Sequence, residues 1–517
     1  MDGLYKSDGQ QLNLDAVDVR PVIKTGIKIA TINGTSIFAP DSEGGGGGGT
    51  TIVQNGSGDN MAFLYKENIK ADRPYYFDDS YANIASFTDN SYLDALCDSV
   101  PEGKHFIFNT DSHIDYDDNI GWKQKETAVI AYVKAKLNIR NYIFGGDCIG
   151  GRASKYEAAK ILAYYCNEKF NAFGGDFIFV MGNHDVNYPM IGNGGHTREE
   201  SLIPDVEAYK HTTKIMQQYG IAHWDTNGIA LVDNLNITSD EKEAMKAWMT
   251  LHYYYDDDKQ RIRYIVIESG DYGDTVKYLF NTGGYNCNCC YLDWIHETFL
   301  SCPDNYDIII ITHQSDYHFE NGGNVTLSGA FFNNLALMIN ALKNKTVHSF
   351  SRPHKYDPVA AGSLTGVAGD FFKLRSGSNT LVRRYDYTQS NWHGRIFIIG
   401  GHYHYDDAHL IKSAGASTDP QDTRPLAYVG TEYDNNPTTD SSSILLIEFD
   451  RCCAHGQSLT AGNAEKPHAV SYPNNQDETR IGTTNEVLFD VVTITNDSKV
   501  VCTRFGAGSN RQYDIPD

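Results

Sequence analysis

The sequence predicts an α/β protein whose short buried strands end along a common edge. Five compact apolar runs indicate these strands, because each is rich in β-branched or aromatic residues and stops at small or polar ones: residues 106–108, 142–144, 177–180, 308–311 and 396–399. Between the first three runs, residues 123–138 and 153–170 carry apolar side chains at helical spacing. Strands joined through such helices run parallel, so their carboxyl ends meet in the crevice where open α/β sheets bind ligands.

A separate piece precedes this region. Residues 27–32 alternate apolar and polar side chains, Asn33-Gly34 is a strong turn signal, and residues 35–39 resume the alternation, which predicts a β-hairpin. Glycines and polar residues dominate residues 44–60 and indicate a flexible linker. Because residues 1–43 are too few for a core of their own, we expect a small β attachment segment that packs on a larger body or on another chain.

We expect residues 61–517 to form one large domain. Its middle part predicts three helices and one strand, at residues 205–218, 239–252, 291–300 and 261–268, respectively. The three tyrosines at residues 253–255 are expected in the core or on a hairpin, with the wall of a cleft as the alternative. Residues 484–517 predict a C-terminal strand pair.

Composition sets the broad class. The chain has 517 residues, of which 41% are hydrophobic, enough for a large buried core. Its formal net charge of −23 opposes general binding to DNA or RNA, which depends on Lys and Arg neutralising phosphates. No stretch is apolar enough for a membrane span, and the polar first residues predict synthesis in the cytosol without a signal peptide. The ten cysteines are expected to be free or occasionally paired, with a structural zinc at residues 287–290 and 452–453 as the alternative.

Side chains suited to metal binding follow each of the five strands. They are Asp111, His113, Asp147, Asn183, His313, His402 and His404. Carboxylate, imidazole and amide oxygen suit divalent or trivalent Mn, Fe, Zn or Ni, whereas a soft metal would call for thiolates. Cys148 is expected to be structural, since its side chain should point away from that of Asp147 in an extended stretch. The pattern therefore predicts one metal centre at the common strand edge.

In chain order, these motifs are D-x-H at residues 111–113, G-D at 146–147, G-N-H-D at 182–185, a lone histidine at 313 and G-H-x-H at 401–404. The ordered set resembles the calcineurin-like metallophosphoesterase superfamily over roughly residues 104–450. Each motif alone is weak, but all five in order are specific. The resemblance implies a four-layer α/β/β/α sandwich, with two mixed sheets face to face, and hydrolysis of a phosphomonoester or phosphodiester.

The resemblance also implies two metal ions. The first would take Asp111, His113, Asp147 and His404. The second would take Asp147, Asn183, His313 and His402, so that the Asp147 carboxylate bridges the pair. Two carboxylates against two divalent ions leave a net charge of about +2, which suits a phosphate group, and a water held between the ions would attack as hydroxide.

His184 has a different implied role. In such phosphoesterases this histidine protonates the leaving oxygen or steadies the developing charge, and Asp185 and the backbone are expected to orient it. Family members often have an aspartate three residues after the bridging one, which pairs with this histidine. Gly150 stands at that position here, so the sequence leaves His184 without that partner.

Residues 314–395 are expected to form a partly basic insertion between His313 and His402, anchored at the rim of the site. Part of the insertion is expected to contact an anionic substrate, and a solvated surface segment is the alternative. The candidates are His348, Arg352, His354, Arg383 and Arg384. Asp406 and Asp407 are expected to be solvated loop charge, with the orientation of a ligand histidine as the alternative for Asp406.

The flanks carry a second resemblance. Residues 26–40 and the glycine run resemble the leading segments of structural proteins of tailed bacteriophages, and residues 490–509 are similar to the terminal strands of phosphoesterases from phages and gut bacteria. The resemblances imply a phosphorylated substrate for the large domain, and other proteins of the virion tail as partners of the attachment segment. The alternative function is a virion structural component that uses the phosphoesterase fold as a scaffold or host-contact module. Assembly of the chain into a homo-oligomer is a further alternative that the sequence leaves open.

Overall fold

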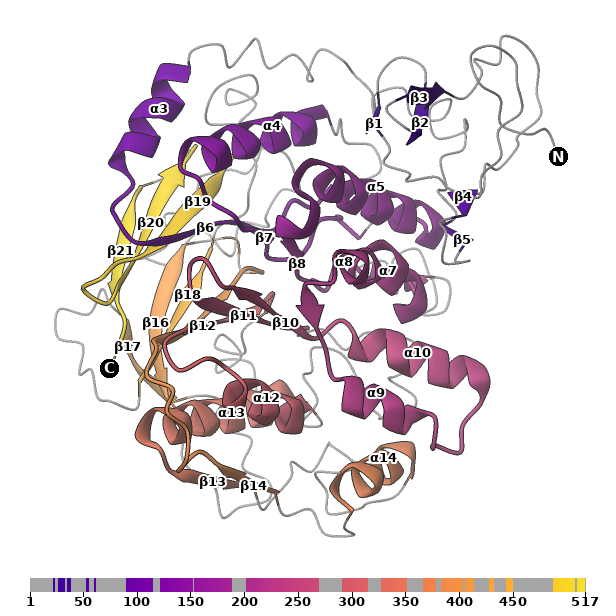
Figure 1. Ribbon diagram of the computed structural model, residues 1–517, viewed down its shortest axis with the longest axis vertical. Helices are drawn as coiled ribbons and strands as arrows, with labels where there is room; N and C mark the ends of the chain where they lie inside the picture. The colour runs from indigo at the N-terminus through magenta and orange to yellow at the C-terminus, as the bar shows by residue number, and fades with distance from the viewer. Residues whose placement is uncertain are drawn as a thin grey trace, which may run out of the picture.

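The protein is a mixed α/β molecule, described here from a computed structural model (Figure 1). The structure describes residues 22–23, 27–32, 35–38, 53–54, 60–61, 90–114, 121–151, 153–187, 201–268, 291–314, 327–350, 366–377, 383–402, 404, 406–412, 427–431, 443–449, 487–506 and 509–516. Two large sheets dominate it, one with six strands and one with eight.

The six-stranded sheet has the order β21-β20-β19-β6-β7-β8. Its three parallel strands are β6 (Lys104–Asn109), β7 (Tyr142–Phe144) and β8 (Phe177–Phe179). The remaining three are antiparallel, and they are β19 (Phe489–Ile494), β20 (Lys499–Phe505) and β21 (Arg511–Asp514). The predicted C-terminal strand pair is thus present, and β19 attaches it directly to β6.

Helices connect the parallel strands as the spacing predicts. They are α4 (Gly121–Lys136) and α5 (Lys155–Phe173), preceded along the chain by α3 (Asn90–Ser99). The hydroxyl of Ser154 accepts the amide of Glu157 at the start of α5, as an N-cap residue does. At its end, Gly174 has a φ of 58°, which favours glycine. A short 3₁₀ turn, η3 (Gly174–Asp176), then leads into β8.

The eight-stranded sheet has the order β17-β16-β18-β15-β12-β11-β10-β9. Its four parallel strands are β11 (Ile262–Ile267), β12 (Asp307–Thr312), β15 (Ile396–Gly400) and β18 (Ile444–Glu448). Antiparallel strands flank them on both sides, and they are β9 (Ala222–His223), β10 (Tyr253–Asp257), β16 (Asp407–Lys412) and β17 (Ala427–Thr431). Along β10, Tyr253 and Tyr255 are buried, whereas Tyr254 is half-buried.

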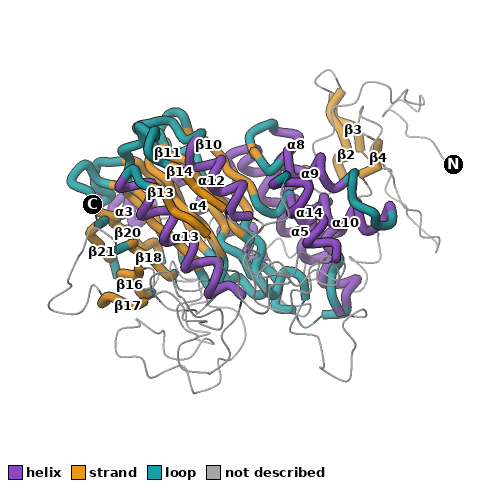
Figure 2. Tube along the Cα trace, turned by 90° about the horizontal axis from the view of Figure 1, so that it is seen from below, coloured by secondary structure: helices purple, strands orange, loops and turns teal. Residues whose placement is uncertain are grey.

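Seven more helices follow along the described part of the chain. They are α7 (Asp205–His211), α8 (Thr213–Tyr219), α9 (Thr226–Val232), α10 (Ser239–Met249), α12 (Tyr291–Leu300), α13 (Leu327–Asn344) and α14 (Gly366–Ser376). Of these, α7 packs on α5. Figure 2 shows α8, α9, α10 and α14 grouped to one side of the strands. A small hairpin of β13 (Val347–Phe350) and β14 (Arg383–Asp386) completes this part.

The single helix predicted over residues 205–218 is wrong in one respect, because it breaks at Thr212 into α7 and α8. Thr212 has φ −118° and ψ −95°, which are not helical angles. Its hydroxyl donates to the carbonyl of Ala208 at 2.8 Å. A threonine that bonds back to the preceding turn in this way competes with the helical ladder.

The two sheets pack against each other through one shared core. Phe106 of β6 meets Tyr264 of β11 edge to face, with ring centroids 5.6 Å apart. Tyr253 of β10 donates its hydroxyl to the carbonyl of Phe179 in β8 at 2.6 Å. Along β12, Ile309 and Ile311 join this core, whereas Ile308 and Ile310 face a second core with α10, α12 and α13. In Figure 1, α4 and α5 accordingly lie beyond the smaller sheet, and α12 and α13 beyond the larger one.

The N-terminal flank contains the expected hairpin, in which β2 (Ile27–Ile32) pairs with β3 (Thr35–Phe38). β1 (Val22–Ile23) adds a third strand to it. The range predicted as a linker holds two short paired strands, β4 (Val53–Gln54) and β5 (Asn60–Met61), although it was expected to be without structure. An attachment role for this flank stays a prediction.

Candidate metal centre

The structure brings the predicted ligand residues together at the carboxyl ends of five strands. β6, β7 and β8 of the smaller sheet lead into Asp111, Asp147 and Asn183. β12 and β15 of the larger sheet lead into His313 and the residues 402–404. Beyond the ends of β6 and β7 the two segments of the polypeptide stay paired. The amide of Asp111 donates to the carbonyl of Gly146 at 2.8 Å, and the amide of His113 donates to the carbonyl of Asp147 at 2.9 Å. The D-x-H and G-D motifs therefore lie side by side.

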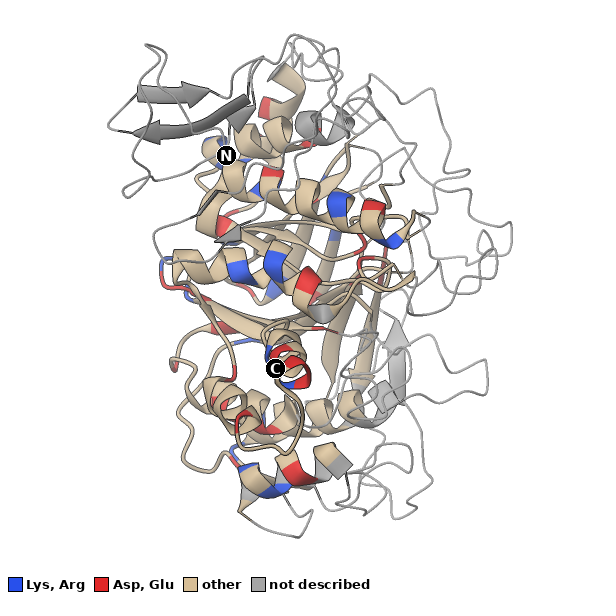
Figure 3. Ribbon diagram, turned by 90° about the vertical axis from the view of Figure 1, so that its right-hand side faces the viewer, with Lys and Arg blue, Asp and Glu red and all other residues tan. Residues whose placement is uncertain are grey.

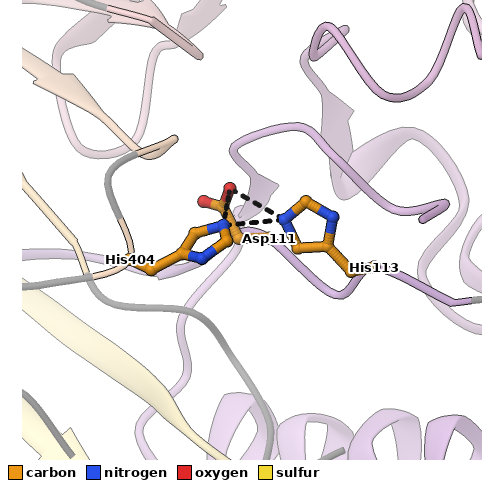
Figure 4. A group of neighbouring side chains, drawn as sticks. All are labelled: Asp111, His113 and His404. Carbon is orange, nitrogen blue, oxygen red and sulfur yellow. Dashed lines mark hydrogen bonds and ion pairs between the residues drawn. The ribbon is translucent and has the colours of Figure 1, made fainter. Parts of the chain in front are cut away.

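Three of these side chains form one tight group (Figure 4). Nε2 of His113 lies 2.7 Å from Nε2 of His404, and Oδ1 of Asp111 lies 3.5 and 3.2 Å from these two nitrogens. The rings of His113 and His404 meet edge to face. Two imidazoles and a carboxylate that share one point in this way are arranged as cation ligands.

A second group adjoins the first. Nε2 of His313 lies 3.0 Å from Oδ2 of Asp147 and 3.9 Å from Oδ1 of Asp111. His402 completes the group with Asp147 and His313. Oδ2 of Asp147 is also 3.8 Å from Nε2 of His113, so this oxygen faces both groups. The Asp147 carboxylate is thus the shared element of the arrangement.

Each carboxylate has one oxygen held by the protein and one oxygen turned toward the histidines. Oδ2 of Asp111 accepts the hydroxyl of Thr110 at 2.7 Å and the amide of His402 at 2.9 Å. Oδ1 of Asp147 accepts the amide of His184 at 2.7 Å. These bonds set the carboxylate planes, so that Asp111 Oδ1 and Asp147 Oδ2 are the free donor atoms.

Backbone carbonyls orient two of the imidazoles. Nδ1 of His313 bonds to the carbonyl of Gly145 at 2.8 Å, and Nδ1 of His184 bonds to the carbonyl of Gly150 at 2.7 Å. A carbonyl only accepts, so Nδ1 carries the hydrogen in both rings and Nε2 is the atom turned inward. At position 150 the backbone therefore contributes the partner that the side chain of an aspartate would otherwise supply.

The buried donor atoms without partners match a cation site. Asp111 Oδ1, Asp147 Oδ2, Asn183 Oδ1 and His313 Nε2 are all buried and have no hydrogen-bond partner among the described residues. Buried polar atoms are rarely left unpaired, because the lost hydration costs about 1–3 kcal/mol for each group. Two carboxylate oxygens, an amide oxygen and an imidazole nitrogen are the donors that divalent Mn, Fe, Zn or Ni accept.

In the ion-free protein, burial and neighbouring charges shift the pKa values of these carboxyls and imidazoles. Burial acts to raise the pKa of the Asp111 and Asp147 carboxyls, but the surrounding histidines outweigh it and hold both pKa values below the usual range. Burial lowers the pKa of His113 and His402 to about 3, which leaves neutral imidazoles. Burial would also lower the pKa of His313, but Asp147 and Asp111 raise it to about 10. The two carboxylates thus draw positive charge to the point between them.

Asp185 does not contact the His184 ring through any described hydrogen bond, although it was expected to orient that histidine. Its carboxylate accepts backbone amides from Asp147, Cys148 and Gly182 at 2.8 Å each. Burial and the nearby Asp147 raise the pKa of Asp185 to about 6. The residue therefore ties the Asp147 loop to the Asn183 loop, and its role in catalysis stays a prediction.

Contact of the basic insertion with substrate stays a prediction, and the described part of the insertion includes β13 and β14. Arg384 lies on β14, is exposed, and bonds to Asp386 at 3.1 Å. The β13–β14 hairpin packs on the helices, since His348 bonds to Asn334 of α13 and Tyr385 to Asp293 of α12. Figure 1 shows the hairpin beyond these helices, away from the sheet. The expected contact of Arg384 with substrate is therefore not supported.

Three other expected substrate residues give no further information. Arg352 and His354 lie outside the described residues, and for Arg383 only its place on β14 is described. Among the cysteines, five are described, and all are buried and outside any disulfide of the described residues: Cys97, Cys148, Cys166, Cys302 and Cys502. Residues 287–290 and 452–453, where a zinc was the alternative, also lie outside the described residues.

Asp406 and Asp407 were expected to be solvated loop charges, and this expectation is wrong because both are buried. Asp406 is 1% exposed and bonds to Arg504 at 2.6 Å. Asp407 is 7% exposed and lies 3.2 Å from His409. Charged side chains are rarely buried to this extent unless they are paired. Local sequence patterns could not indicate the partner of Asp406, because Arg504 lies 98 residues further along the chain.

Comparisons with known proteins add little to this picture. No family model and no curated protein matches the chain. One similar solved structure is a dimetal phosphatase from Danio rerio, which is 10% identical, with 80% of this chain and 100% of that chain covered and a TM-score of 0.36. Likeness at that level carries no weight for fold or function. Within the described residues, no helix is both long and apolar enough to span a membrane.

Proposed function

We propose that this chain is a phosphoric ester hydrolase that works with two metal ions. The observation that carries the proposal is the meeting of three unpartnered buried donor atoms from both sheets, on Asp111, Asp147 and His313, next to four further histidines. Such a set is costly for a folded protein unless a cation satisfies it. The same residues stand in the five motifs that resemble the metallophosphoesterase superfamily.

The groups of side chains support one assignment of the ligands. The first ion would be held by Asp111, His113, Asp147 and His404. The second would be held by Asp147, Asn183, His313 and His402. When bound, such a pair supplies Lewis acidity and an activated water for in-line displacement at phosphorus. The donor set leaves Mn, Fe, Zn and Ni all acceptable.

The chain itself would supply the proton for the leaving group. The side chain of His184 is 20% exposed, more than those of His113, His313 and His404, and its Nε2 lies 3.9 Å from Oδ2 of Asp147. Because Nδ1 donates to Gly150, a proton carried on Nε2 faces the site. We therefore assign His184 as the general acid, with the Gly150 carbonyl as its orienting partner.

The fold supports the same proposal at the level of layers. The two sheets share a core, and helices pack on the outer face of each. We propose that this arrangement is the four-layer α/β/β/α sandwich of the superfamily. The substrate class is then a phosphomonoester or a phosphodiester, since the fold alone does not choose between them.

The proposal is tested by metal reconstitution. The purified full chain, loaded separately with Mn²⁺, Fe²⁺, Zn²⁺ or Ni²⁺, should bind two ions and hydrolyse p-nitrophenyl phosphate or bis-p-nitrophenyl phosphate. Asp147→Asn should lose both ions and the activity, because Oδ2 of Asp147 faces both groups. Asp257→Asn is the matched control, since Asp257 is equally buried but lies on β10 at the opposite end of the strands.

Hydrolysis of neither ester by the fully loaded chain would overturn the proposal. That result would favour the structural role that the sequence left as the alternative.

A further inference from the structure

Four charged residues form a buried cluster beside the candidate metal centre. Arg504 and Arg511 meet Asp406 and Asp490, and none of the four is more than 7% exposed. Nη2 of Arg504 donates to Oδ1 of Asp406 at 2.6 Å and to Oδ2 of Asp490 at 2.8 Å. Nη2 of Arg511 donates to Asp490 at 2.9 Å and lies 3.2 Å from Asp406. Two guanidinium groups thus balance two carboxylates.

This cluster joins the two sheets. Asp490, Arg504 and Arg511 stand on β19, β20 and β21 of the smaller sheet. Asp406 ends the loop that connects β15 to β16 of the larger sheet. The guanidinium of Arg511 also lies 5.6 Å from the ring centre of Phe449, which follows β18. The C-terminal strands therefore reach across to the larger sheet at this point.

The loop that Asp406 ends is the one that carries His402 and His404. Two hydrogen bonds fix the beginning of this loop. The amide of Gly401 donates to the carbonyl of His313, and the amide of His402 donates to Oδ2 of Asp111, both at 2.9 Å. The end of the loop is tied down by Asp406. His404 lies between the two ties, in a left-handed conformation with φ 58°. A side chain held in such a conformation keeps its direction only while both ends of the loop are fixed.

The candidate ligands are divided between the same two sheets. Asp111 and Asp147 follow strands of the smaller sheet, whereas His402 and His404 follow β15 of the larger sheet. The first ligand group needs His404 within about 3 Å of its partners from the other sheet. Asp490 is the register partner of Phe108 in β6, the strand that leads to Asp111. The cluster thus spans from one half of the ligand set to the other.

We propose that Arg504, supported by Arg511, is a positioning residue of the metal centre, which holds the loop of His402 and His404 against the C-terminal strands. The proposal rests on the proposed function in assigning these histidines to metal. Without the Arg504 guanidinium, the buried carboxylates of Asp406 and Asp490 would lose one of the two guanidinium groups that balance their charge. A buried carboxylate without a balancing positive charge is unstable, so Asp406 would move toward solvent and the loop of His402 and His404 would become less fixed. Residues that orient metal ligands through such contacts typically change metal affinity by about 10- to 100-fold.

The test compares two buried arginines by isothermal titration of the full chain with Mn²⁺. Arg504→Met should weaken binding of at least one Mn²⁺ by about 10- to 100-fold. Arg263→Met is the matched control, because Arg263 is 2% exposed and bonds to Asp256 at 2.6 Å, but it stands at the start of β11, away from the ligand edge. Its melting temperature should fall, but its Mn²⁺ affinity should stay at the wild-type value.

Two further variants keep the test decisive. Arg504→Lys should bind Mn²⁺ with intermediate affinity, since one ammonium group cannot repeat the guanidinium contacts to both carboxylates. If Arg504→Met does not fold, the double variant Arg504→Met with Asp406→Asn leaves Arg511 and Asp490 charge-balanced. It should show the same loss of affinity, because it also removes the tie to the loop.

The outcomes separate this inference from the proposed function. Wild-type affinity in Arg504→Met, or in the double variant, would overturn the positioning role and leave the hydrolase proposal standing. A wild-type chain that binds two Mn²⁺ ions without hydrolysing any ester would overturn the function only. A wild-type chain that binds no Mn²⁺ would overturn both.

Discussion

The candidate ligands adopt backbone conformations that ordinary residues avoid. Five of them have a positive φ, between 45° and 75°, and they are Asp111, His113, Asp147, His402 and His404. Such conformations cost about 1–3 kcal/mol each and cluster at functional sites, where the surrounding structure enforces them. Here the enforcing contacts are backbone hydrogen bonds, such as that from His113 to the carbonyl of Asp147. The strain is the local cost of aiming several polar side chains at one point.

At this scale the sharpest prediction concerns His184. His184→Ala should lower the turnover number by about 10²- to 10⁴-fold, the usual contribution of a general acid, while metal content stays at the wild-type level. Steady-state kinetics and elemental analysis of the same preparation measure both quantities. His223→Ala is the control, because His223 is an exposed histidine stacked on Tyr254 of β10. Loss of metal from His184→Ala would instead identify this residue as a ligand.

A glycine beside the ligands leads to a second prediction at this scale. A Cβ on Gly182 would collide with the carboxylate and the amide of Asp147. Gly182→Ala should therefore displace Asp147 and weaken Mn²⁺ binding by at least about 10-fold, as loss of ligand orientation does. Titration calorimetry measures it, with Gly377→Ala as the control: its φ of 62° makes alanine costly for stability, but a Cβ there has nothing within 4 Å and so displaces no ligand. Unchanged affinity would show that the loop absorbs the extra carbon.

At the scale of single elements, α10 begins with a complete capping box. The hydroxyl of Thr238 accepts the amide of Glu241 at 3.3 Å, and the carboxylate of Glu241 accepts the amide of Thr238 at 2.8 Å. Thr238→Ala should lower the free energy of unfolding by about 1 kcal/mol, because one amide loses its acceptor. Urea denaturation measures this, and Thr238→Ser should be nearly neutral because it keeps the hydroxyl. Equal losses in the two variants would contradict a capping role.

The pairing of β16 with β18 predicts a dependence on pH. His409 of β16 lies 3.2 Å from Asp407 and 3.6 Å from Glu448. Burial acts to lower the pKa of His409, but the two carboxylates outweigh it and raise the pKa to about 9. Because this pKa lies above the unfolded value of 6.5, the stabilisation is complete below pH 6.5 and is lost as the pH rises through about 9.

Between pH 6.5 and pH 9.5 the free energy of unfolding should therefore fall, by an amount on the order of 2 kcal/mol. Urea denaturation at a series of pH values measures the slope. His409→Gln should show a flatter curve, because its amide does not titrate. Parallel curves for the two proteins would exclude His409 as the source.

At the scale of the whole molecule, ligands from both sheets make metal binding a link between them. Removal of metal by a chelator should therefore lower the melting temperature, and Mn²⁺ should restore it. An ion at a hundred times its Kd stabilises the folded state by about 2.7 kcal/mol. Differential scanning calorimetry measures the shift, and Asp147→Asn should show none. Identical melting temperatures with and without metal in the wild-type chain would argue against a cross-sheet site.

On the side seen in Figure 3, Lys and Arg are interspersed with Asp and Glu over the helices. With a net charge of −23, the chain offers no continuous basic field there for a nucleic-acid backbone. This agrees with a substrate recognised at a small centre rather than along an extended surface.

Much of the fold and of the donor chemistry could be predicted from local patterns. The apolar runs 106–108 and 308–311 mark the strands β6 and β12, because a buried strand needs nothing beyond its own residues to be recognised. The residue types after each run indicated a cation, because carboxylate and imidazole have fixed ligand preferences. The local patterns predicted neither the break at Thr212, which a single side-chain hydrogen bond decides, nor the helices α3, α9, α13 and α14.

By itself, then, the sequence determined the five strands that precede the candidate ligands and the donor types that follow them. Only the tertiary structure decided which groups orient those donors. His184 bonds to the Gly150 carbonyl, Asp185 accepts backbone amides, and Asp406 pairs with Arg504. The physical reason is the separation along the sequence of the residues that interact. Strand period and ligand type are properties of neighbouring residues, whereas these contacts join residues that only the order of strands in two sheets brings within 3 Å.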